Sequence, residues 1–308
     1  MKIFLINENR REQQWLTSAL KLKDQIDSVN CFERGYELDV EEANFSSSVI
    51  IVSQDQFAAL RRQMSKHYSA KELPCPILIL TESFESFDVS GYRDLTLDAF
   101  PTSSITPEIL RYLLSTLQRE FRKDLRLKRL AHYDTLTGAT NRHLFSDRTK
   151  QAIASAKRQG EPLSLLYFDL DDFKGINDKY GHNTGDAYLS AFSDTIIQSI
   201  RDSDTFGRLG GDEFALLMPK SMETDAINKA QQIQRELAAK RSINQYALSI
   251  ATSIGIVSFD PAKIDDINYT SLVGYADKAA FESKRKGHHL YSVHRIRKKR
   301  VAKDAEPA

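Results

Sequence analysis

Short apolar runs alternate with amphipathic stretches over the first hundred residues of the chain. Three runs are rich in Ile, Val and Leu: KIFLI (2–6), SVIIV (48–52) and PILIL (76–80). Such runs are typical of strands that are buried on both faces. The stretch after the first run spaces four apolar residues as one face of a helix: Trp15, Leu16, Ala19 and Leu20. The alternation predicts a doubly wound parallel α/β sheet over residues 1–104.

The pattern of one long helix occupies residues 105–132. It begins with Thr106-Pro107, a favourable pair for an N-cap and a first helical position. Its apolar residues follow a 4-3-4 spacing and then drift out of strict heptads near Asp124: Leu110, Leu114, Leu117, Phe121, Leu125 and Leu130. We predict a helical linker, part of which forms a coiled-coil seam between two copies of the chain. The alternative is a helix that packs on its own domain.

Strand-like and helix-like stretches follow another order in residues 133–296. Strands are predicted in three places: 163–170, 204–218 and 246–259. Helices are predicted near 143–158, 184–201 and 222–240. A hairpin among helices favours a mixed, mainly antiparallel α/β sheet. Residues 297–308 form a charged tail, which we expect to be flexible.

Composition restricts the class of protein. The chain has 41% apolar and 28% charged residues and a formal net charge of +1, which is typical of a soluble globular protein without a field that attracts nucleic acid. Cys31 and Cys75 lack the spacing of a metal site, and we expect reduced, structural thiols. No run reaches the roughly 20 apolar residues of a membrane span, and the first residues do not resemble a signal peptide. We therefore expect a cytoplasmic protein with no membrane insertion and no nucleic-acid partner.

Two like charges stand beside a predicted turn. A Gly-Gly pair at 210–211 separates two strand-like arms, which predicts a tight hairpin with Asp212 and Glu213 at its tip. Acidic residues are common in solvated turns, so this pair alone is ambiguous. Another predicted strand, however, also ends in carboxylates, beginning with Asp169. Hard oxygen ligands from separate elements suit Mg²⁺ and a polyphosphate, with Lys174 to neutralise phosphate oxygens.

Four stretches, in their order and spacing, resemble the GGDEF-domain family of diguanylate cyclases. They are DTLTGATNR (134–142), FDLDDFKGINDKYGHNTGD (168–186), RLGGDEF (208–214) and ADKAAFESKRKG (276–287). The resemblance covers roughly residues 133–292. It implies an enzyme that condenses two GTP molecules into cyclic di-GMP and releases pyrophosphate, with the two active sites facing each other in a homodimer.

The resemblance also assigns roles to single residues. Two divalent ions, Mg²⁺ or Mn²⁺, would be held at each active site by Asp169, the carbonyl of Leu170 and Asp212. Glu213 matches the residue that assists deprotonation or metal binding. Further residues match nucleotide-binding positions: Phe173, Lys174, Lys284 and His288 near the phosphates, and Asn177 and Asp186 at the guanine.

Two of these positions bear on the substrate. A carboxylate at Asp186 can accept hydrogen bonds from both N1–H and the exocyclic amine of guanine, which predicts a preference for GTP over ATP. His288 stands where the family has an arginine that binds phosphate. A histidine cannot make a bidentate fork, so we expect weaker GTP binding, with Arg285 or Lys286 as partial substitutes.

Arg201 and Asp204 are spaced as in the family's inhibitory product-binding site. An ion pair at the end of a helix has the same spacing and is the structural alternative. The resemblance implies that cyclic di-GMP binds these two residues and inhibits the enzyme. A second functional hypothesis is a catalytically weak effector that binds cyclic di-GMP through this pair, and a third is an interaction scaffold built on the coiled coil.

The N-terminal domain resembles a response-regulator receiver whose chemistry has been lost. Where that family has an acidic pair, an aspartate and a lysine after its strands, this chain has Asn7-Glu8, Ser53 and Thr102. Thr81 alone keeps the expected residue type, and Asp55 could be a displaced phosphate acceptor. We therefore expect a degenerate receiver-like domain that serves dimerisation or responds to another input, such as an upstream signalling protein.

Overall fold

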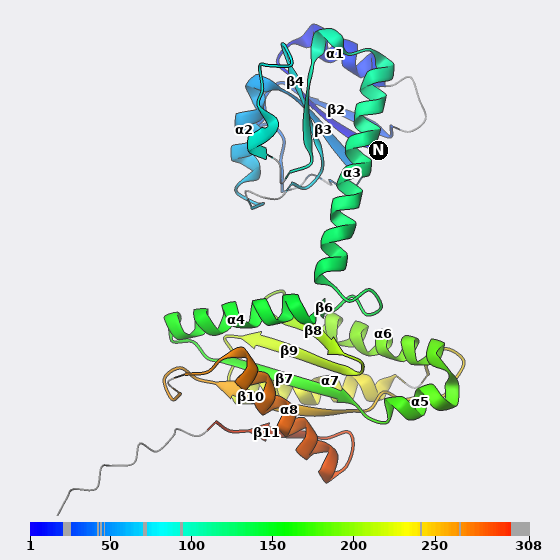
Figure 1. The fold of residues 1–308 in the computed structure, drawn as a ribbon, viewed down its shortest axis with the longest axis vertical. Coiled ribbons are helices and arrows are strands. Elements are labelled where there is room, and N and C mark those ends of the chain that lie inside the picture. Colours follow the sequence, from blue (N-terminus) through cyan, green and yellow to red (C-terminus); the bar gives the residue numbers. More distant parts are fainter. Residues whose placement is uncertain are drawn as a thin grey trace, which may run out of the picture. The chain divides into compact units, whose positions relative to one another are not determined.

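The computed structural model describes residues 1–20, 26–41, 43, 45, 47–69, 73–92, 95–240, 242–264 and 266–296 (Figure 1). The chain divides into two compact units, Met1–Lys128 and Arg129–Ala308, and each is considered by itself. The predicted tail at 297–308 lies outside the described residues.

The N-terminal unit is built on a parallel sheet, as predicted. Its five strands are β1 (Lys2–Ile6), β2 (Ser28–Phe32), β3 (Ser48–Ser53), β4 (Ile77–Thr81) and β5 (Leu97–Pro101). They lie in the order β2-β1-β3-β4-β5, and every neighbouring pair is parallel. The apolar runs predicted β1, β3 and β4. The outer strands β2 and β5 were not predicted, because exposed polar residues interrupt their apolar runs.

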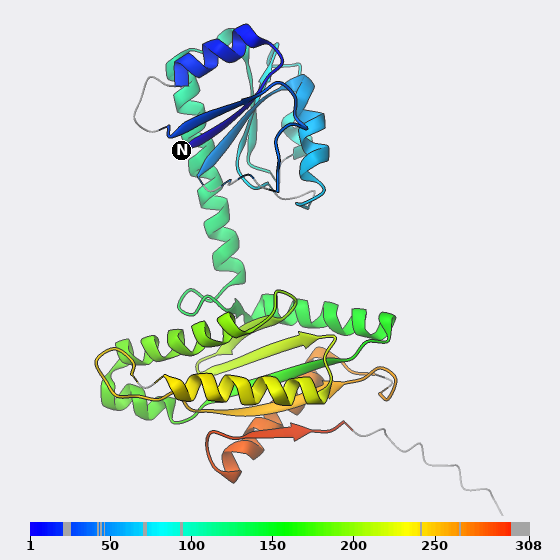
Figure 2. The same ribbon diagram turned by 180° about the vertical axis from the view of Figure 1, so that it is seen from behind.

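Helices cover both faces of this sheet (Figures 1 and 2). Helices α1 (Arg10–Leu20) and α3 (Pro107–His132) share one apolar core with the sheet, and α2 (Gln54–Met64) shares the other. Successive strand residues point to opposite faces, so each strand contributes to both cores. Of the predicted helix face, Leu16, Ala19 and Leu20 are buried, but Trp15 is 40% exposed and lies outside the core.

The packing of the long helix α3 contradicts part of the predicted coiled-coil seam. Leu110, Leu114 and Leu117 pack in the core of the N-terminal unit, so the first half of α3 follows the alternative of a helix on its own domain. The helix continues without a break through Asp124. Further along, Leu125, Leu127 and Leu130 are 49%, 55% and 49% exposed. These three leucines of the second half form an apolar surface that a second copy could cover.

The C-terminal unit contains a mixed, mainly antiparallel sheet, which confirms the prediction. Its strands are β6 (Thr140–Asn141), β7 (Leu163–Leu170), β8 (Thr205–Gly210), β9 (Glu213–Pro219), β10 (Thr252–Phe259) and β11 (Tyr291–His294). The order is β11-β10-β7-β9-β8-β6. The central pairs are antiparallel, and only the outer strands β11 and β6 pair in parallel. Residues 246–251, predicted as strand, precede β10 instead.

Helices cover both faces of the second sheet as well. They are α4 (Arg142–Gln159), α5 (Phe173–Tyr180), α6 (His182–Ser199), α7 (Glu223–Ala239) and α8 (Tyr269–Lys286). Helices α6 and α7 share one apolar core with the sheet, whereas α4 and α8 share the other. The apolar pattern predicted α4, α6 and α7 but neither α5 nor α8. Helix α5 has only eight residues and buries none of them, and the buried face of α8 consists mainly of alanines, so neither gives a strong apolar pattern.

A glycine lets α8 lie directly on the sheet. A Cβ atom at Gly255 of β10 would come within 1.9 Å of the carbonyl oxygen of Ala276. Because no side chain separates the two backbones, α8 runs close along β10 and β7. Its carboxyl end therefore reaches the end of β7 at which the carboxylates stand.

Two further predictions concern the whole chain. Among the helices that the structure describes, none is both long enough and apolar enough to cross a membrane. Both cysteines are free thiols, but only Cys75 is structural in the predicted sense, because Cys31 is exposed. Burial raises the pKa of the Cys75 thiol.

Candidate active site

The Gly-Gly hairpin joins β8 to β9 and is held by two arginines. The Arg208 guanidinium donates two hydrogen bonds to the carbonyl of Gly211, at 2.9 and 2.7 Å, and a third, at 3.1 Å, to the carboxylate of Asp134. Arg142 donates to the carbonyl of Leu209 at 2.6 Å. Burial opposes ionisation of Asp134, but hydrogen bonds from Thr137 and Arg208 bring the pKa of its carboxyl below the ordinary value. The tip of the hairpin is therefore held both by Arg208 of its own first strand and by Arg142 of α4.

Three carboxylates meet where β7 ends and β9 begins. Asp169 and Glu213 are direct partners in the antiparallel register of these two strands, so their side chains leave the same face of the sheet. Asp212 precedes Glu213 in the turn, and its carbonyl accepts a hydrogen bond of 3.3 Å from the N–H of Leu170. The structure thus brings together the four residues predicted for metal binding and catalysis.

Lys284 forms an ion pair with the Asp169 carboxylate of this cluster. Its ammonium lies 2.5 Å from a carboxylate oxygen of Asp169 and comes from the last turn of α8. Burial raises the pKa of the Asp169 carboxyl. The lysine opposes this shift, whereas the nearby charges of Asp212 and Glu213 add to it. The cluster carries more negative charge than Lys284 alone offsets, which is the electrostatic condition for binding a cation.

The donor set fits a divalent ion that shares its ligands with a substrate. Across the described residues, no group of three or more His, Cys, Asp or Glu side chains is gathered closely enough to hold a metal ion by itself. Mg²⁺ takes hard oxygen ligands and usually one or two protein carboxylates, together with phosphate oxygens and water. Asp169 and Asp212 can supply such carboxylates beside the backbone of Leu170.

Asn177 and Asp186 belong to two consecutive helices, α5 and α6, which only Gly181 separates. The two helices therefore meet at a helix–glycine–helix corner. The side chain of Asn177 lies against Gly185, where an added Cβ would stand 1.9 Å from its Oδ1 atom. Asp186 is the next residue along α6 and is exposed. Gly185 thus allows the amide and the carboxylate to lie close together, although the sequence analysis did not single it out.

Aromatic rings form the base of this corner. Phe173 lies within 3.4 Å of the same Gly185 position, and its ring centroid is 6.2 Å from that of Tyr188. The buried Tyr188 hydroxyl accepts a 3.0 Å hydrogen bond from the N–H of Ala251, and burial raises the pKa of Tyr188 to about 12. Lys174 lies on the first turn of α5, and its side chain is exposed.

His288 lies beside a carboxylate that the sequence analysis did not assign. Its Nδ1 atom is 3.2 Å from Oδ1 of Asp171, and 68% of its side chain is exposed. The expected substitutes lie elsewhere: the ammonium of Lys286 is 3.3 Å from the hydroxyl of Ser292, and Arg285 is exposed. The signal for Asp171 was present in the Asp-x-Asp pattern at the end of β7, but the pattern does not reveal that this carboxylate is buried.

Arg201 and Asp204 are neighbours at the start of β8. Asp204 is buried and accepts a 3.1 Å hydrogen bond from the backbone N–H of Arg201, whereas the Arg201 side chain is exposed. Burial raises the pKa of the Asp204 carboxyl, against the effect of its contact with Arg201. The aspartate thus orders the turn that presents the arginine.

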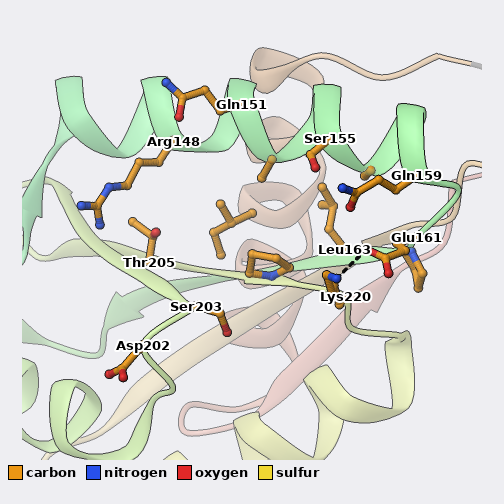
Figure 3. A pocket seen from close by; sticks show the side chains of 15 residues that line it. Arg148, Gln151, Ser155, Gln159, Glu161, Leu163, Asp202, Ser203, Thr205 and Lys220 are labelled. Atoms are coloured by element: carbon orange, nitrogen blue, oxygen red, sulfur yellow. Dashed lines mark ion pairs between the residues drawn. The ribbon is translucent and has the colours of Figure 1, made fainter. Parts of the chain in front are cut away.

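A cavity of 440 Å³ adjoins this turn (Figure 3). Arg148, Gln151, Ser155 and Gln159 project from α4 on one side, and Asp202, Ser203 and Thr205 lie on the other. An ion pair of 3.1 Å between Lys220 and Glu161 closes one end. Because Leu163 also lines it, the cavity lies at the start of β7, at the opposite end of the strand from Asp169.

The N-terminal unit has a cavity of its own, of 770 Å³. It gathers every residue that the sequence analysis compared with a receiver: Asn7, Glu8, Ser53, Asp55, Thr81 and Thr102. These residues stand at or just beyond the carboxyl ends of parallel strands, where such a sheet collects polar side chains. None of the described residues lining the cavity is a lysine or an arginine.

Comparison with known proteins identifies what the C-terminal unit resembles. A family model described as "Diguanylate cyclase, GGDEF domain" matches residues 131–289. The diguanylate cyclase DgcS of Shewanella oneidensis is 32% identical over 189 residues, which are 61% of this chain and 60% of DgcS. The bifunctional diguanylate cyclase/cyclic di-GMP phosphodiesterase MucR of Pseudomonas aeruginosa is 36% identical over 170 residues, which are 55% of this chain and 24% of MucR. The matched region is therefore less than two thirds of the length of either relative.

A solved structure agrees with this match. The coiled coil and GGDEF domain of DgcB from Caulobacter crescentus, in complex with cyclic di-GMP, is similar with a TM-score of 0.53 and 28% sequence identity. The similarity covers 61% of this chain and 97% of that one.

Proposed function

Because the chain belongs to the GGDEF family of diguanylate cyclases, we propose that it condenses two GTP molecules into one cyclic di-GMP and two pyrophosphates. The observation that carries the proposal is the meeting of Asp169, Asp212 and Glu213 beside Lys284. In each half-reaction a ribose 3′-oxygen bonds to the α-phosphorus of the other GTP. The bond from that phosphorus to the bridging oxygen of pyrophosphate breaks.

Asp169, Asp212 and the carbonyl of Leu170 are the residues proposed to hold two divalent ions, Mg²⁺ or Mn²⁺. Bound there, the ions would supply Lewis acidity that lowers the pKa of the 3′-hydroxyl and offsets charge on the triphosphate. Glu213, opposite Asp169 in the register, is proposed to assist deprotonation or metal binding. Lys284 exchanges the carboxylate of Asp169 for a phosphate oxygen when substrate binds.

The guanine is proposed to lie at the corner between α5 and α6. Asp186 accepts from N1–H and the exocyclic amine, Asn177 completes the base contact, and Phe173 lines the base of the site. A site built for these donors favours GTP over ATP, because adenine leaves the carboxylate unpaired. Lys174, Lys284 and the outward side of His288 are proposed to contact the phosphates.

A homodimer is part of the proposal, because the described residues of one chain form one such site and the reaction needs two GTP molecules. The exposed second half of α3, with Leu125, Leu127 and Leu130, is the surface proposed to pair in a coiled coil. The similar structure of DgcB, which contains a coiled coil and the GGDEF domain, supports this arrangement.

Cyclic di-GMP is proposed to inhibit the enzyme at Arg201 and Asp204. The exposed guanidinium is available to stack on or bond to the ligand, while buried Asp204 fixes the turn. Arg201→Ala should abolish inhibition by added cyclic di-GMP without changing the initial rate. Inhibition that persists unchanged in this variant would exclude the site.

The decisive test of the proposed function is incubation of the purified chain with GTP and Mg²⁺, followed by product analysis. Cyclic di-GMP should form with the wild type and not with Asp212→Ala. If neither protein forms product and the wild type still binds cyclic di-GMP through Arg201, the chain is instead an effector. For the N-terminal unit we propose a degenerate receiver-like role in dimerisation or in response to an upstream signalling protein, because Ser53 cannot form an acyl phosphate.

A further inference from the structure

Asp171 is a buried carboxylate next to the site that has no role in the proposed function. Only 5% of its side chain is exposed, whereas its neighbour Asp172 is exposed. A buried carboxylate is costly unless hydrogen bonds satisfy its oxygens. The partners of Asp171 therefore indicate what its burial achieves.

The carboxylate of Asp171 contacts two other segments of the fold. One oxygen accepts from the hydroxyl of Ser253 at 2.8 Å and lies 3.2 Å from Nδ1 of His288. The other accepts from the backbone N–H of His289 at 2.8 Å. The side chain thus joins the end of β7 to the start of β10 and to the loop that follows α8.

This loop begins directly after the helix turn that carries Lys284. The N–H of Gly287 donates to the carbonyl of Lys284 at 3.4 Å, and α8 ends at Lys286. His289 adopts a φ of 63°, which is unfavourable for a residue with a side chain, so contacts outside the loop must hold it in this form. The hydrogen bond from His289 to Asp171 is such a contact.

We propose that Asp171 is a positioning residue for the triphosphate end of the substrate site. It anchors the carboxyl end of α8, from which Lys284 extends, and it binds Nδ1 of His288 so that Nε2 faces outward. The inference rests on the proposed function, because the triphosphate is the group that Lys284 and His288 would contact. It explains how a histidine at this position can act in a defined orientation without the two-pronged geometry of an arginine.

The guanine end should not depend on the Asp171 side chain. The hydrogen bonds of the carboxylate go to β10 and to the loop after α8, whereas Asn177 and Asp186 lie on α5 and α6. The backbone N–H of Asp171 does bond to the carbonyl of Ala251, close to Tyr188, but a side-chain substitution leaves that bond in place. An effect through Asp171 should therefore be selective for phosphate.

The test compares ligands in the full-length chain with Mg²⁺ present. The ligands are guanosine, pyrophosphate and a GTP analogue with a methylene group between the α- and β-phosphorus atoms, which cannot release pyrophosphate. In Asp171→Asn we expect the affinities for pyrophosphate and the analogue to fall about tenfold, and that for guanosine to stay within about twofold. Asp186→Asn is the matched control: it should lower the affinities for guanosine and the analogue about tenfold and leave that for pyrophosphate within about twofold.

Coupling to the histidine is measured with His288→Ala, an exposed position at which the fold is not at risk. The double variant Asp171→Asn/His288→Ala should lose less affinity for the analogue than the sum of the single losses. If Asp171→Asn does not fold, Ser253→Ala removes one donor and should give a smaller loss with the same selectivity.

Equal losses for guanosine and the analogue, or no loss for either, would overturn the inference and leave the proposed function standing. Failure of the wild-type chain to bind the analogue would instead contradict the proposed function and the inference together.

Discussion

The two units both collect acidic side chains at the ends of strands, but they neutralise them differently. In the C-terminal unit, Asp169 pairs with Lys284 and Asp134 pairs with Arg208. In the N-terminal unit, carboxylates of Glu8, Glu12, Asp55 and Glu82 line a cavity together with amides and hydroxyls, and no lysine or arginine is among the described residues that line it.

The topology explains why both clusters exist. In a parallel sheet all carboxyl ends lie at one edge, so residues after β1, β3, β4 and β5 meet whatever their chemistry. In the antiparallel sheet the end of β7 meets the start of β9, which brings Asp169 to Glu213. The cations differ in distance: Lys284 lies 2.5 Å from Asp169, whereas the guanidinium of Arg34, which does not line the N-terminal cavity, lies 3.9 Å from Glu8.

The largest expected difference between the units is in turnover. Asp169→Asn should lower the rate of cyclic di-GMP formation by about 10³-fold or more, because it removes a charge proposed to stabilise the transition state. Asp55→Asn makes the same chemical change in the N-terminal cavity and should alter the rate by less than about twofold. Rates of product formation measured side by side would contradict the comparison if both variants were equally impaired.

Two glycines allow a second paired test. A Cβ at Gly185 would clash with the Asn177 side chain at 1.9 Å, and a Cβ at Gly35 would clash with the backbone of Leu60 at 2.7 Å. Both alanine substitutions should destabilise their own unit by about 1–3 kcal/mol. Only Gly185→Ala should also raise the KM for GTP, because it displaces a proposed guanine contact. A similar KM change in Gly35→Ala would show that general destabilisation, and not the base site, is responsible.

A smaller, pH-dependent effect is expected at Asp134. The pKa of the Asp134 carboxyl is lower in the folded chain than its ordinary value of 3.8. The ionised carboxylate therefore stabilises the fold fully above pH 3.8, and this stabilisation is lost as the pH falls through the lowered pKa. Asp134→Asn should therefore reduce the free energy of unfolding at pH 7 by about 1–3 kcal/mol. Denaturant titrations of the wild type and the variant should converge at acid pH, and a difference independent of pH would contradict the ion-pair interpretation.

The smallest expected effect is the response of the N-terminal cavity to a phosphoryl donor. Acetyl phosphate should change neither the oligomeric state nor the rate of cyclic di-GMP formation, because Ser53 replaces the required aspartate. Gel filtration and activity assays with and without the reagent test this. A response that disappears in Asp55→Asn would establish Asp55 as a displaced acceptor.

Much of the C-terminal site could be predicted because its residues are close in sequence to strong patterns. The apolar strand before Asp169 and the Gly-Gly hairpin before Asp212 each locate a strand end, and antiparallel pairing makes their meeting plausible. Helices α5 and α8 were missed because α5 is short and buries none of its residues, and α8 buries mainly alanines. For the leucines of α3 the pattern was recognised but its partner was not. A heptad-like spacing indicates a buried face, but it does not distinguish burial against the same chain from burial against a second copy.

The sequence by itself determined the two sheet types, the carboxylate cluster and the family to which the chain belongs, because these depend on local periodicity and on motifs. Only the tertiary structure decided that Leu110, Leu114 and Leu117 bury against their own sheet, and that Asp171 meets His288 and His289 across more than a hundred residues of chain. The physical reason is that burial and hydrogen bonding are properties of surfaces brought together from distant segments. The sequence alone does not distinguish an aspartate that is exposed to solvent in the fold, such as Asp172, from one that is buried, such as Asp171.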